Sequence, residues 1–411
     1  MKQMELYIHI PFCMRKCRYC DFLSSVEDEA TQNLYVRALL SEIAFYGGLY
    51  RNRTVTTVYI GGGTPSWLKE SAIVSILNEV RRAFVILPDA EVTIECNPGT
   101  LTGYKFSVYR RVGINRISIG LQSADDDELK RLGRVHTYAQ FLKTYELARQ
   151  NGFSNINIDL MSGLPGQSLS DYKATLQKVI RLKPEHISAY SLMIEEGTPY
   201  YEQYKFDLVR QEAGLKPQFL PSEDEVYQMT QLTSQMLAAA GYGQYEISNF
   251  AVRGYECRHN IGYWRRENYL GVGLGASSLI DNIRYSNLRD LHEYIEQTKQ
   301  IRSGLWENEH KEADGTVRIE ELPAVSIHAS AERIGRNAQM EEFMFLGLRM
   351  TDGISRTAFE QCFGKPIEAV YQDVLLRLVK EGLLVKHAGR IFLTERGRDV
   401  SNYAMAQFLL P

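Results

Sequence analysis

Alternation of strand-like and helix-length segments is the feature that most restricts the fold of this 411-residue chain. Short runs rich in β-branched and aromatic residues recur over the first 200 residues, and segments long enough for helices separate them. Such alternation indicates parallel strands joined by crossover helices. We therefore expect an α/β fold, a TIM-like partial (β/α)6 barrel, with a doubly wound sheet as the competing layout. The predicted strands are LYIHI (6–10), TVYIGG (57–62), EVTIEC (91–96), RISIGL (116–121), NINIDL (155–160) and HISAYSL (186–192).

Polar or glycine residues stand at the carboxyl end of nearly every predicted strand. In a parallel barrel these ends meet at one rim, where binding and catalytic residues gather. One such residue would mean little, but six strands that each deliver one to the same rim indicate a binding site. The residues at this rim are Tyr7, Gly61, Gly62, Gly63, Thr64, Glu95, Gln122, Asp159 and Tyr190.

Three of the six cysteines lie within eight residues, in the segment CMRKCRYC at 13–20. This crowding suggests a metal site and not a disulfide framework. A [4Fe–4S] cluster is usually held by four thiolates. The spacing C-x3-C-x2-C supplies three and leaves one iron open to a small molecule, and basic residues in the loop could offset the charge of the cluster. The alternative is a zinc site whose fourth ligand is Cys257 or a histidine.

The overall composition is that of an ordinary globular protein, with 44% hydrophobic and 24% charged residues. A formal charge of -3 gives no electrostatic case for nucleic acid or for an anionic membrane. No apolar run reaches the roughly 18 residues that span a bilayer, and the opening MKQMELYIHI indicates a strand, not a secretory signal. We expect a cytoplasmic protein whose thiols stay reduced.

The pattern changes after residue 200. Ser222 and Glu225 form a potential capping box for a helix that extends to about 240, GQYEISNFA (243–251) is a strand candidate, and residues 303–337 are polar and irregular. From 338 onward, predicted helices followed by a small hairpin indicate a helical, winged-helix-like domain with balanced charges, so DNA binding is not expected. The chain thus divides into a barrel (1–200), a connecting region (201–337) and a C-terminal helical domain (338–411).

The cysteine segment CMRKCRYC resembles the signature of the radical S-adenosylmethionine (SAM) superfamily. The resemblance implies that Cys13, Cys17 and Cys20 ligate a [4Fe–4S] cluster. In that superfamily the open iron binds the amino and carboxylate groups of SAM, and reduction of the cluster cleaves SAM to methionine and a 5'-deoxyadenosyl radical. The chemistry belongs to the cofactors, while the protein binds and orients them and excludes water.

Further motifs resemble the oxygen-independent coproporphyrinogen oxidase (HemN-like) family: YIHIPFC, YIGGGTP, IECNP, RISIGLQS, LGRVH, NIDLMSGLPGQ and ISAYSL. They cover residues 1–200, and the C-terminal domain also resembles the small helical domain of that family. The residue chemistry agrees, because glycines after a strand permit close backbone approach and an arginine can pair with a carboxylate. The SAM pocket that the resemblance implies consists of Tyr7, Tyr19, Gly62, Gly63, Thr64, Glu95, Gln122, Arg134 and Asp159.

Two features depart from the oxidases. The oxidases resemble C-x3-C-x2-C-x-C, whereas Phe22 stands at the position of their further cysteine. They also carry a long amino-terminal extension, whereas twelve residues precede Cys13 here. Both differences argue against coproporphyrinogen oxidation.

The segment CRHNIGYW (257–264) matches the H-N-x-x-Y-W motif of the HemW relatives, which resemble the oxidases but act as heme chaperones. His259 is then a candidate axial ligand, since imidazole suits heme iron. Tyr263 and Trp264 could stack on a flat macrocycle. The alternative is that these three side chains only pack the segment against the barrel.

These observations favour a heme chaperone of the radical SAM type that binds a [4Fe–4S] cluster, SAM and heme. The resemblance implies that such a protein transfers heme to client hemoproteins, such as a membrane-bound respiratory protein. The alternatives are an oxygen-independent coproporphyrinogen III dehydrogenase and a HemN-like radical SAM methyltransferase. Productive cleavage of SAM, a homodimer and covalent attachment of heme stay open at this stage.

Overall fold

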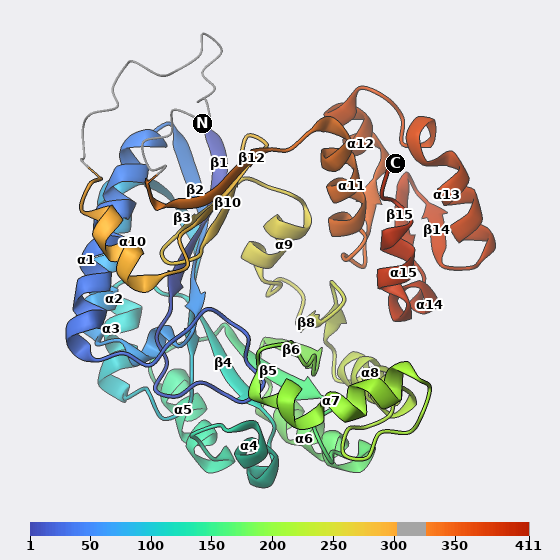
Figure 1. The fold of residues 1–411 in the computed structure, drawn as a ribbon, viewed down its shortest axis with the longest axis horizontal. Helices are drawn as coiled ribbons and strands as arrows, with labels where there is room; N and C mark the ends of the chain where they lie inside the picture. The colour runs from blue at the N-terminus through green and yellow to red at the C-terminus, as the bar shows by residue number, and fades with distance from the viewer. Residues whose placement is uncertain (302–325, 411) are drawn as a thin grey trace.

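The computed structural model describes residues 1–301 and 326–410 and contains a large α/β barrel and a small C-terminal domain (Figure 1). Six parallel strands stand in chain order, each beside its sequence neighbour. A doubly wound sheet would reverse its strand order at a switch point, so the partial barrel is confirmed. The strands are β1 (Lys2–Ile10), β2 (Arg53–Gly62), β3 (Val85–Cys96), β4 (Arg116–Gln122), β5 (Ile156–Ser162) and β6 (His186–Ser191).

Helices connect these strands and cover the outside of the barrel (Figure 1). Several begin at side chains that accept a hydrogen bond from the first turn, such as Asp28, Thr137 and Ser168, which satisfies backbone donors that would otherwise lack partners. The connecting helices are α1 (Glu29–Leu49), the 3-10 turn η1 (Pro65–Trp67), α2 (Glu70–Ala83), α3 (Gly103–Arg111), α4 (Asp126–Leu132), α5 (Tyr138–Gln150) and α6 (Leu169–Leu182).

Alternation within each strand separates the core from the barrel interior, because successive side chains point to opposite faces. Ile94 and Ile158 face the helices and belong to the buried apolar core. Their neighbours Glu95 and Asp159 point the other way and line a cavity. The interior of this barrel is therefore lined by polar side chains, whereas the apolar side chains face the helices.

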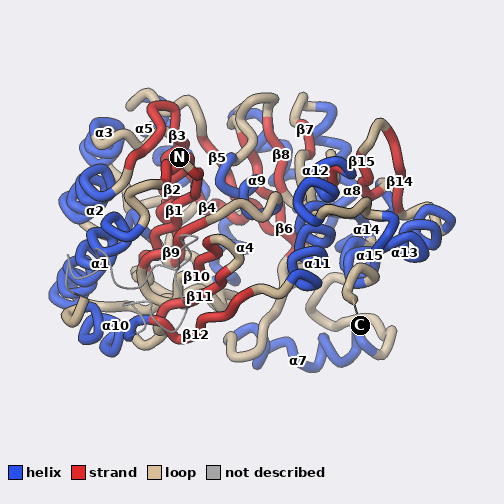
Figure 2. Tube along the Cα trace, turned by 90° about the horizontal axis from the view of Figure 1, so that it is seen from above, coloured by secondary structure: helices blue, strands red, loops and turns tan. Residues whose placement is uncertain are grey.

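The barrel is open, since in the described sheet β1 pairs onward with β9 and β6 with β8 (Figure 2). On the β1 side, β9 (Tyr269–Val272), β10 (Ser277–Ile280), β11 (Ile283–Asn287) and β12 (His328–Arg333) extend the sheet, with α10 (Leu291–Thr298) against α1. On the β6 side lie α7 (Pro199–Glu212), α8 (Glu223–Ala239) and a short hairpin. The helix α9 (Arg258–Trp264) contacts both β2 and the C-terminal domain.

In the connecting region, one expected feature is present and another differs. The capping box of Ser222 and Glu225 is present at the start of α8. The strand expected at 243–251 is instead a hairpin of β7 (Gly243–Gln244) and β8 (Asn249–Ala251), because Glu246 accepts hydrogen bonds from Ser248 and Asn249 and closes a turn within that segment. The irregular segment expected at 303–337 falls largely outside the described residues, and its last part forms β12.

The C-terminal domain has its own apolar core. Helices precede a β-hairpin, as expected, and the short strand β13 adds a third strand to it. Along the part of the chain that the structure describes, no helix is both long and apolar enough to cross a membrane. The elements are α11 (Arg336–Gly347), β13 (Ile354–Ser355), α12 (Arg356–Phe363), α13 (Glu368–Lys380), β14 (Leu384–His387), β15 (Arg390–Leu393), α14 (Glu395–Asp399) and α15 (Ser401–Ala406).

Candidate functional site

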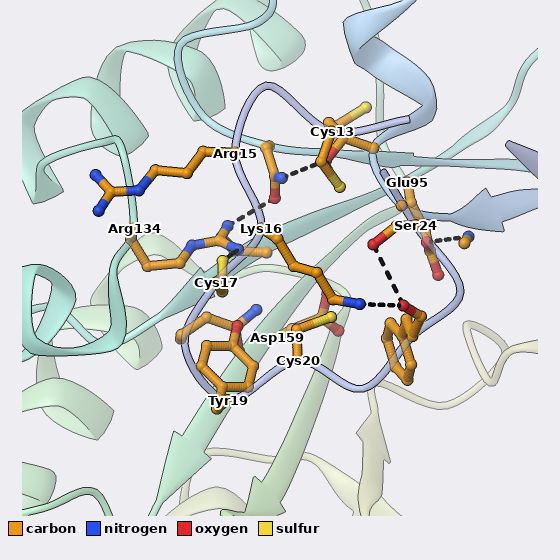
Figure 3. A pocket seen from close by; sticks show the side chains of 18 of the residues that line it. Cys13, Arg15, Lys16, Cys17, Tyr19, Cys20, Ser24, Glu95, Arg134 and Asp159 are labelled. Carbon is orange, nitrogen blue, oxygen red and sulfur yellow. Dashed lines mark hydrogen bonds between the residues drawn. The ribbon is translucent and has the colours of Figure 1, made fainter. Parts of the chain in front are cut away.

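The cysteine loop follows β1 and lies across the rim of the barrel. Backbone hydrogen bonds fix its path: Cys13 N donates to Ser25 O at 2.9 Å, and Arg18 N donates to Leu132 O at 3.1 Å. Cys13, Cys17 and Cys20 all line one cavity of about 140 Å³, the cysteine cavity (Figure 3). The three thiols that the sequence singled out are thus brought together at the carboxyl ends of the strands.

Donors from the neighbouring loops point at two of these sulfurs. Thr64 Oγ1 donates to Cys13 Sγ at 3.4 Å, and Arg134 Nη1 donates to Cys17 Sγ at 3.6 Å. Lys16 also lines the cavity. Hydrogen bonds to cluster sulfurs and nearby positive charge stabilise an iron–sulfur cluster that carries negative charge. The donor set therefore fits a polynuclear cluster.

The zinc alternative depends on a fourth ligand from outside the loop. Among residues 1–301 and 326–410, no group of three His, Cys, Asp or Glu side chains, the loop cysteines included, lies close enough to hold a single metal ion. Cys257, the candidate fourth ligand, is buried away from the loop and contacts Glu91 Oε1 at 3.5 Å. Burial raises the pKa of the Cys20 thiol to about 11, so metal binding at this position would displace a proton.

The turn after β2 brings backbone against the cysteine loop, and only glycine fits there. Gly62 has φ 113°, and a Cβ at this position would stand 2.5 Å from the His9 ring. At Gly63 a Cβ would stand 2.8 Å from the carbonyl oxygen of Phe12 and 3.1 Å from Cys13 Sγ. A side chain at either position would therefore push the turn away from the cysteine cavity.

Two buried carboxylates line the cavity from β3 and β5. Glu95 accepts hydrogen bonds from Tyr59 Oη at 2.8 Å and Gly62 N at 3.0 Å, and burial raises its pKa to about 7. Asp159 accepts from Asn157 Nδ2 at 2.7 Å, and burial raises its pKa as well. Desolvation disfavours the charged form of each acid. A cationic or hydroxyl-bearing ligand would stabilise the charged forms.

Arg134 is held in place by residues that sequence reasoning did not select. Its Nη2 donates to Asn97 Oδ1 at 2.6 Å and to the carbonyl oxygen of Gly120 at 2.7 Å. Asn97 Nδ2 in turn donates to Thr64 Oγ1 at 2.7 Å. The sequence signal that could have identified Asn97 as a site residue is its position directly after β3, within IECNP. Asn97 thus links three loops of the rim.

All but one of the nine residues expected at SAM line the cysteine cavity. The exception is Tyr7, which lines a different cavity. Its Oη forms a hydrogen bond of 3.0 Å with His9 Nδ1. Tyr19 lies between Cys17 and Cys20 in the loop, and its ring centroid is 6.5 Å from that of Tyr200. Gln122 has φ 73° at the end of β4, a conformation that is uncommon for residues other than glycine.

A second cavity of about 460 Å³, the inner cavity, lies inside the barrel and shares Cys20, Glu95 and Asp159 with the cysteine cavity. Its further lining includes Arg116 and Asn260. This volume lies within the range of sites for small organic ligands. Space for a second molecule therefore adjoins the cysteine loop.

A third cavity of about 590 Å³, the interdomain cavity, lies between the barrel edge and α11. Tyr263 and Trp264 of the H-N-x-x-Y-W segment line it, but His259 does not. His259 is buried under these residues: Nδ1 lies 2.7 Å from Thr57 Oγ1, and Nε2 lies 3.2 Å from Tyr263 Oη. Burial lowers the pKa of His259 to about 3, so the ring is neutral at physiological pH.

Comparison with known proteins gives the family. The model of the radical SAM superfamily matches residues 7–179, and that of the HemN C-terminal domain matches residues 334–400. Heme chaperone HemW of Lactococcus lactis is 34% identical, with 100% of this chain and 98% of the relative covered. Heme chaperone HemW of Escherichia coli is 35% identical, with 99% and 98% covered.

The chain belongs to the HemW family of the radical SAM superfamily. Its fold is similar to that of coproporphyrinogen III oxidase (HemN) from Escherichia coli, a radical SAM enzyme, with a TM-score of 0.80, 23% identity, and 99% of this chain and 90% of that chain covered. This likeness concerns the fold. Phe22, two residues after Cys20, has a side chain that is 62% exposed and lines both the cysteine and inner cavities.

Proposed function

We propose that this HemW-family protein is a heme chaperone that binds a [4Fe–4S] cluster, SAM and heme, and transfers heme to client hemoproteins. The observation that carries the proposal is the presence of two separate cavities. One is lined by three cysteines, and the other is lined by Tyr263 and Trp264 of the H-N-x-x-Y-W segment. Heme could therefore be bound at the same time as the cluster and SAM without competing with them for space.

In this proposal Cys13, Cys17 and Cys20 hold the cluster, and the rim residues of the cysteine cavity hold SAM. When bound there, a cluster would supply the open iron site and the reducing electron that radical SAM chemistry requires. Glu95 and Asp159 accept hydrogen bonds from the amino or hydroxyl groups of SAM, and Arg134 pairs with its carboxylate. Tyr7 is then a more distant residue that lies behind Tyr59, with 6.3 Å between the ring centroids.

We propose His259 as the iron ligand of heme, with Tyr263 and Trp264 against the macrocycle. A neutral imidazole suits this role, because no proton competes with the metal. Ligation requires the ring to leave Thr57 and Tyr263, which costs about 1 kcal/mol for each hydrogen bond. Heme binding would thus be coupled to a small movement of α9.

Titration with hemin tests the ligand. His259→Ala should lose or strongly shift the Soret band of bound heme, while the cluster and SAM binding persist. His292→Ala, which removes an exposed histidine from α10, is the matched control. Normal heme spectra in His259→Ala would remove the ligand assignment, and loss of both the cluster and thermal stability would assign the residue a packing role.

The inner cavity favours a second candidate function, a radical SAM enzyme that acts on a molecule bound beside the cluster. Coproporphyrinogen III dehydrogenase and a methyltransferase are the two such enzymes considered. An anaerobic assay with coproporphyrinogen III, SAM and a reductant distinguishes the dehydrogenase from the chaperone. We expect no protoporphyrinogen IX, because Phe22 stands where the oxidases carry a cysteine, and clear turnover would favour the dehydrogenase instead.

The relatives named heme chaperones also suggest the cellular setting of this proposal. We propose that the protein acts in the cytoplasm, that its clients include membrane-bound hemoproteins, and that nucleic acid is not a partner. Incubation of heme-loaded protein with an apo-cytochrome, followed by separation and heme spectra of each fraction, tests transfer. Light scattering of the same samples tests a homodimer.

A further inference from the structure

The interdomain cavity is built from both domains. The barrel contributes Tyr263, Trp264 and Leu279, and α11 of the C-terminal domain contributes Phe345. The walls are therefore largely aromatic and apolar. Such walls suit a flat aromatic ligand, because offset stacking adds about 1 kcal/mol to the effect of burial.

A pair of arginines, Arg266 and Arg284, adds positive charge to the lining of this cavity. Arg266, two residues after α9, lines the cavity in a left-handed backbone conformation with φ 57°. Residues other than glycine rarely adopt this conformation, and where they do the strain often serves a site. Arg266 Nε donates to Glu342 Oε2 at 2.6 Å, and Nη1 donates to Asn282 Oδ1 at 2.7 Å. The guanidinium is thus fixed from two sides.

Arg284 on β11 stands beside it in the same cavity. Its Nη2 lies 2.9 Å from Glu342 Oε1, and its Nη1 lies 3.8 Å from the exposed Glu332. One buried carboxylate, Glu342 on α11, is therefore shared by two guanidinium groups. Glu342 orients both arginines and neutralises only part of their charge.

Two donors of this cavity lack an acceptor within the described residues. Arg266 Nη2 and Trp264 Nε1 are buried and make no hydrogen bond there. A buried donor without a partner costs about 1–3 kcal/mol, and such groups are uncommon in native proteins. Both donors belong to residues that line the same cavity. They point to a ligand that brings acceptor oxygens.

We propose that the interdomain cavity binds a flat macrocycle through its carboxylates, which Arg266 and Arg284 receive while Trp264 donates from the side. Charge-assisted hydrogen bonds between arginine and carboxylate are among the stronger polar contacts. The identity of the macrocycle as heme, whose propionates are the carboxylates, rests on the proposed function. Glu342 is a positioning residue in this site.

The ligand itself offers the first test. Hemin and hemin dimethyl ester have the same ring and iron, but the ester carries no free carboxylate. Titration of the reconstituted protein, followed at the Soret band, gives the Kd of each. We expect the ester to bind at least about tenfold more weakly, the effect of one lost charge-assisted hydrogen bond.

Arg284→Gln gives the second test, because its side chain is 34% exposed and its loss should leave the fold intact. We expect it to raise the Kd for hemin about tenfold and to leave the Kd for the ester unchanged. Arg266→Gln should act in the same direction. Arg265→Gln is the matched control, because Arg265 lies on the same turn, is 54% exposed, lies 4.0 Å from Asp352 of the C-terminal domain and does not line the cavity.

The outcomes separate the two proposals. Equal Kd values for hemin and its ester, or hemin binding that neither arginine variant changes, would refute the carboxylate site and leave heme binding intact. Absence of any hemin binding would refute both. If Arg266→Gln does not fold, the ester and Arg284→Gln still decide the question.

Discussion

Glu5 offers a quantitative test of how α9 is held against the barrel. Its side chain is buried below Gly262 of α9, where a Cβ would overlap with the carboxylate, and Oε2 has no hydrogen-bond partner among the described residues. Burial raises its pKa to about 9, with Glu267 and Glu91 acting in the same direction, while Thr57 and Arg258 oppose the rise. His259 Nδ1 lies 3.9 Å away. Glu5 is therefore protonated in the folded protein at neutral pH.

The raised pKa of Glu5 makes the stability of the folded protein depend on pH. Between pH 4.5 and about 9, unfolding releases the Glu5 proton, so the free energy of unfolding falls as pH rises. The slope is about 1.4 kcal/mol per pH unit, which amounts to roughly 3 kcal/mol between pH 6 and pH 8. Glu5→Gln removes this contribution because it does not titrate. The stability of the variant relative to the native protein should therefore rise by that amount over this pH interval.

Thermal unfolding of the reconstituted protein measures the effect. With an unfolding entropy of about 2 cal/mol/K per residue, 3 kcal/mol corresponds to roughly 3 °C in Tm for a chain of this size. The observable is the change with pH in the difference between the two Tm values, so any constant effect of the substitution cancels. Glu202→Gln, at an exposed residue that pairs with Lys205, is the control. A difference that stays constant from pH 6 to pH 8 would refute the protonated, buried Glu5.

Three further predictions concern the cysteine cavity. Alanine at Cys13, Cys17 and Cys20 together should abolish the brown chromophore and the bound iron, whereas Cys362→Ala, at an exposed cysteine of the C-terminal domain, should keep about four irons per chain; a triple variant that retains its iron would contradict the assignment. Gln122→Ala should weaken SAM binding about tenfold in calorimetry, at unchanged iron content, and unchanged affinity would exclude a contact. Gly62→Ala should lower the stability by about 1–3 kcal/mol, because its φ and the His9 ring disfavour a side chain; an unchanged Tm would count against this tight turn.

The barrel could be predicted from sequence because its signals are local. Alternation with a period of two defined each strand, and the residue at each strand end defined the rim, so Glu95, Gln122 and Asp159 line the same cavity as the cysteines. The C-terminal helices and hairpin also followed local patterns. These features depend on neighbours within a few residues.

Contacts between distant segments could not be predicted from sequence. Tyr7, which was expected beside SAM, lines the interdomain cavity, and the strands β9 and β10 that contribute to this cavity follow more than 250 residues later. The partner of His259, Thr57, is 202 residues away in sequence. Neither contact leaves a periodic signal in the chain, and the same holds for Glu342, which brings Arg266 and Arg284 together.

The order of the strands has a consequence for biosynthesis. The cysteine loop leaves the ribosome before the walls of its cavity, which come from strands that end as late as residue 162, and β9, which pairs with β1, follows about a hundred residues later. Domains generally fold as units once their chain is available. Until then the three thiols are unprotected from oxygen and from stray metal ions. Insertion of the proposed cluster is therefore expected only after translation of the barrel.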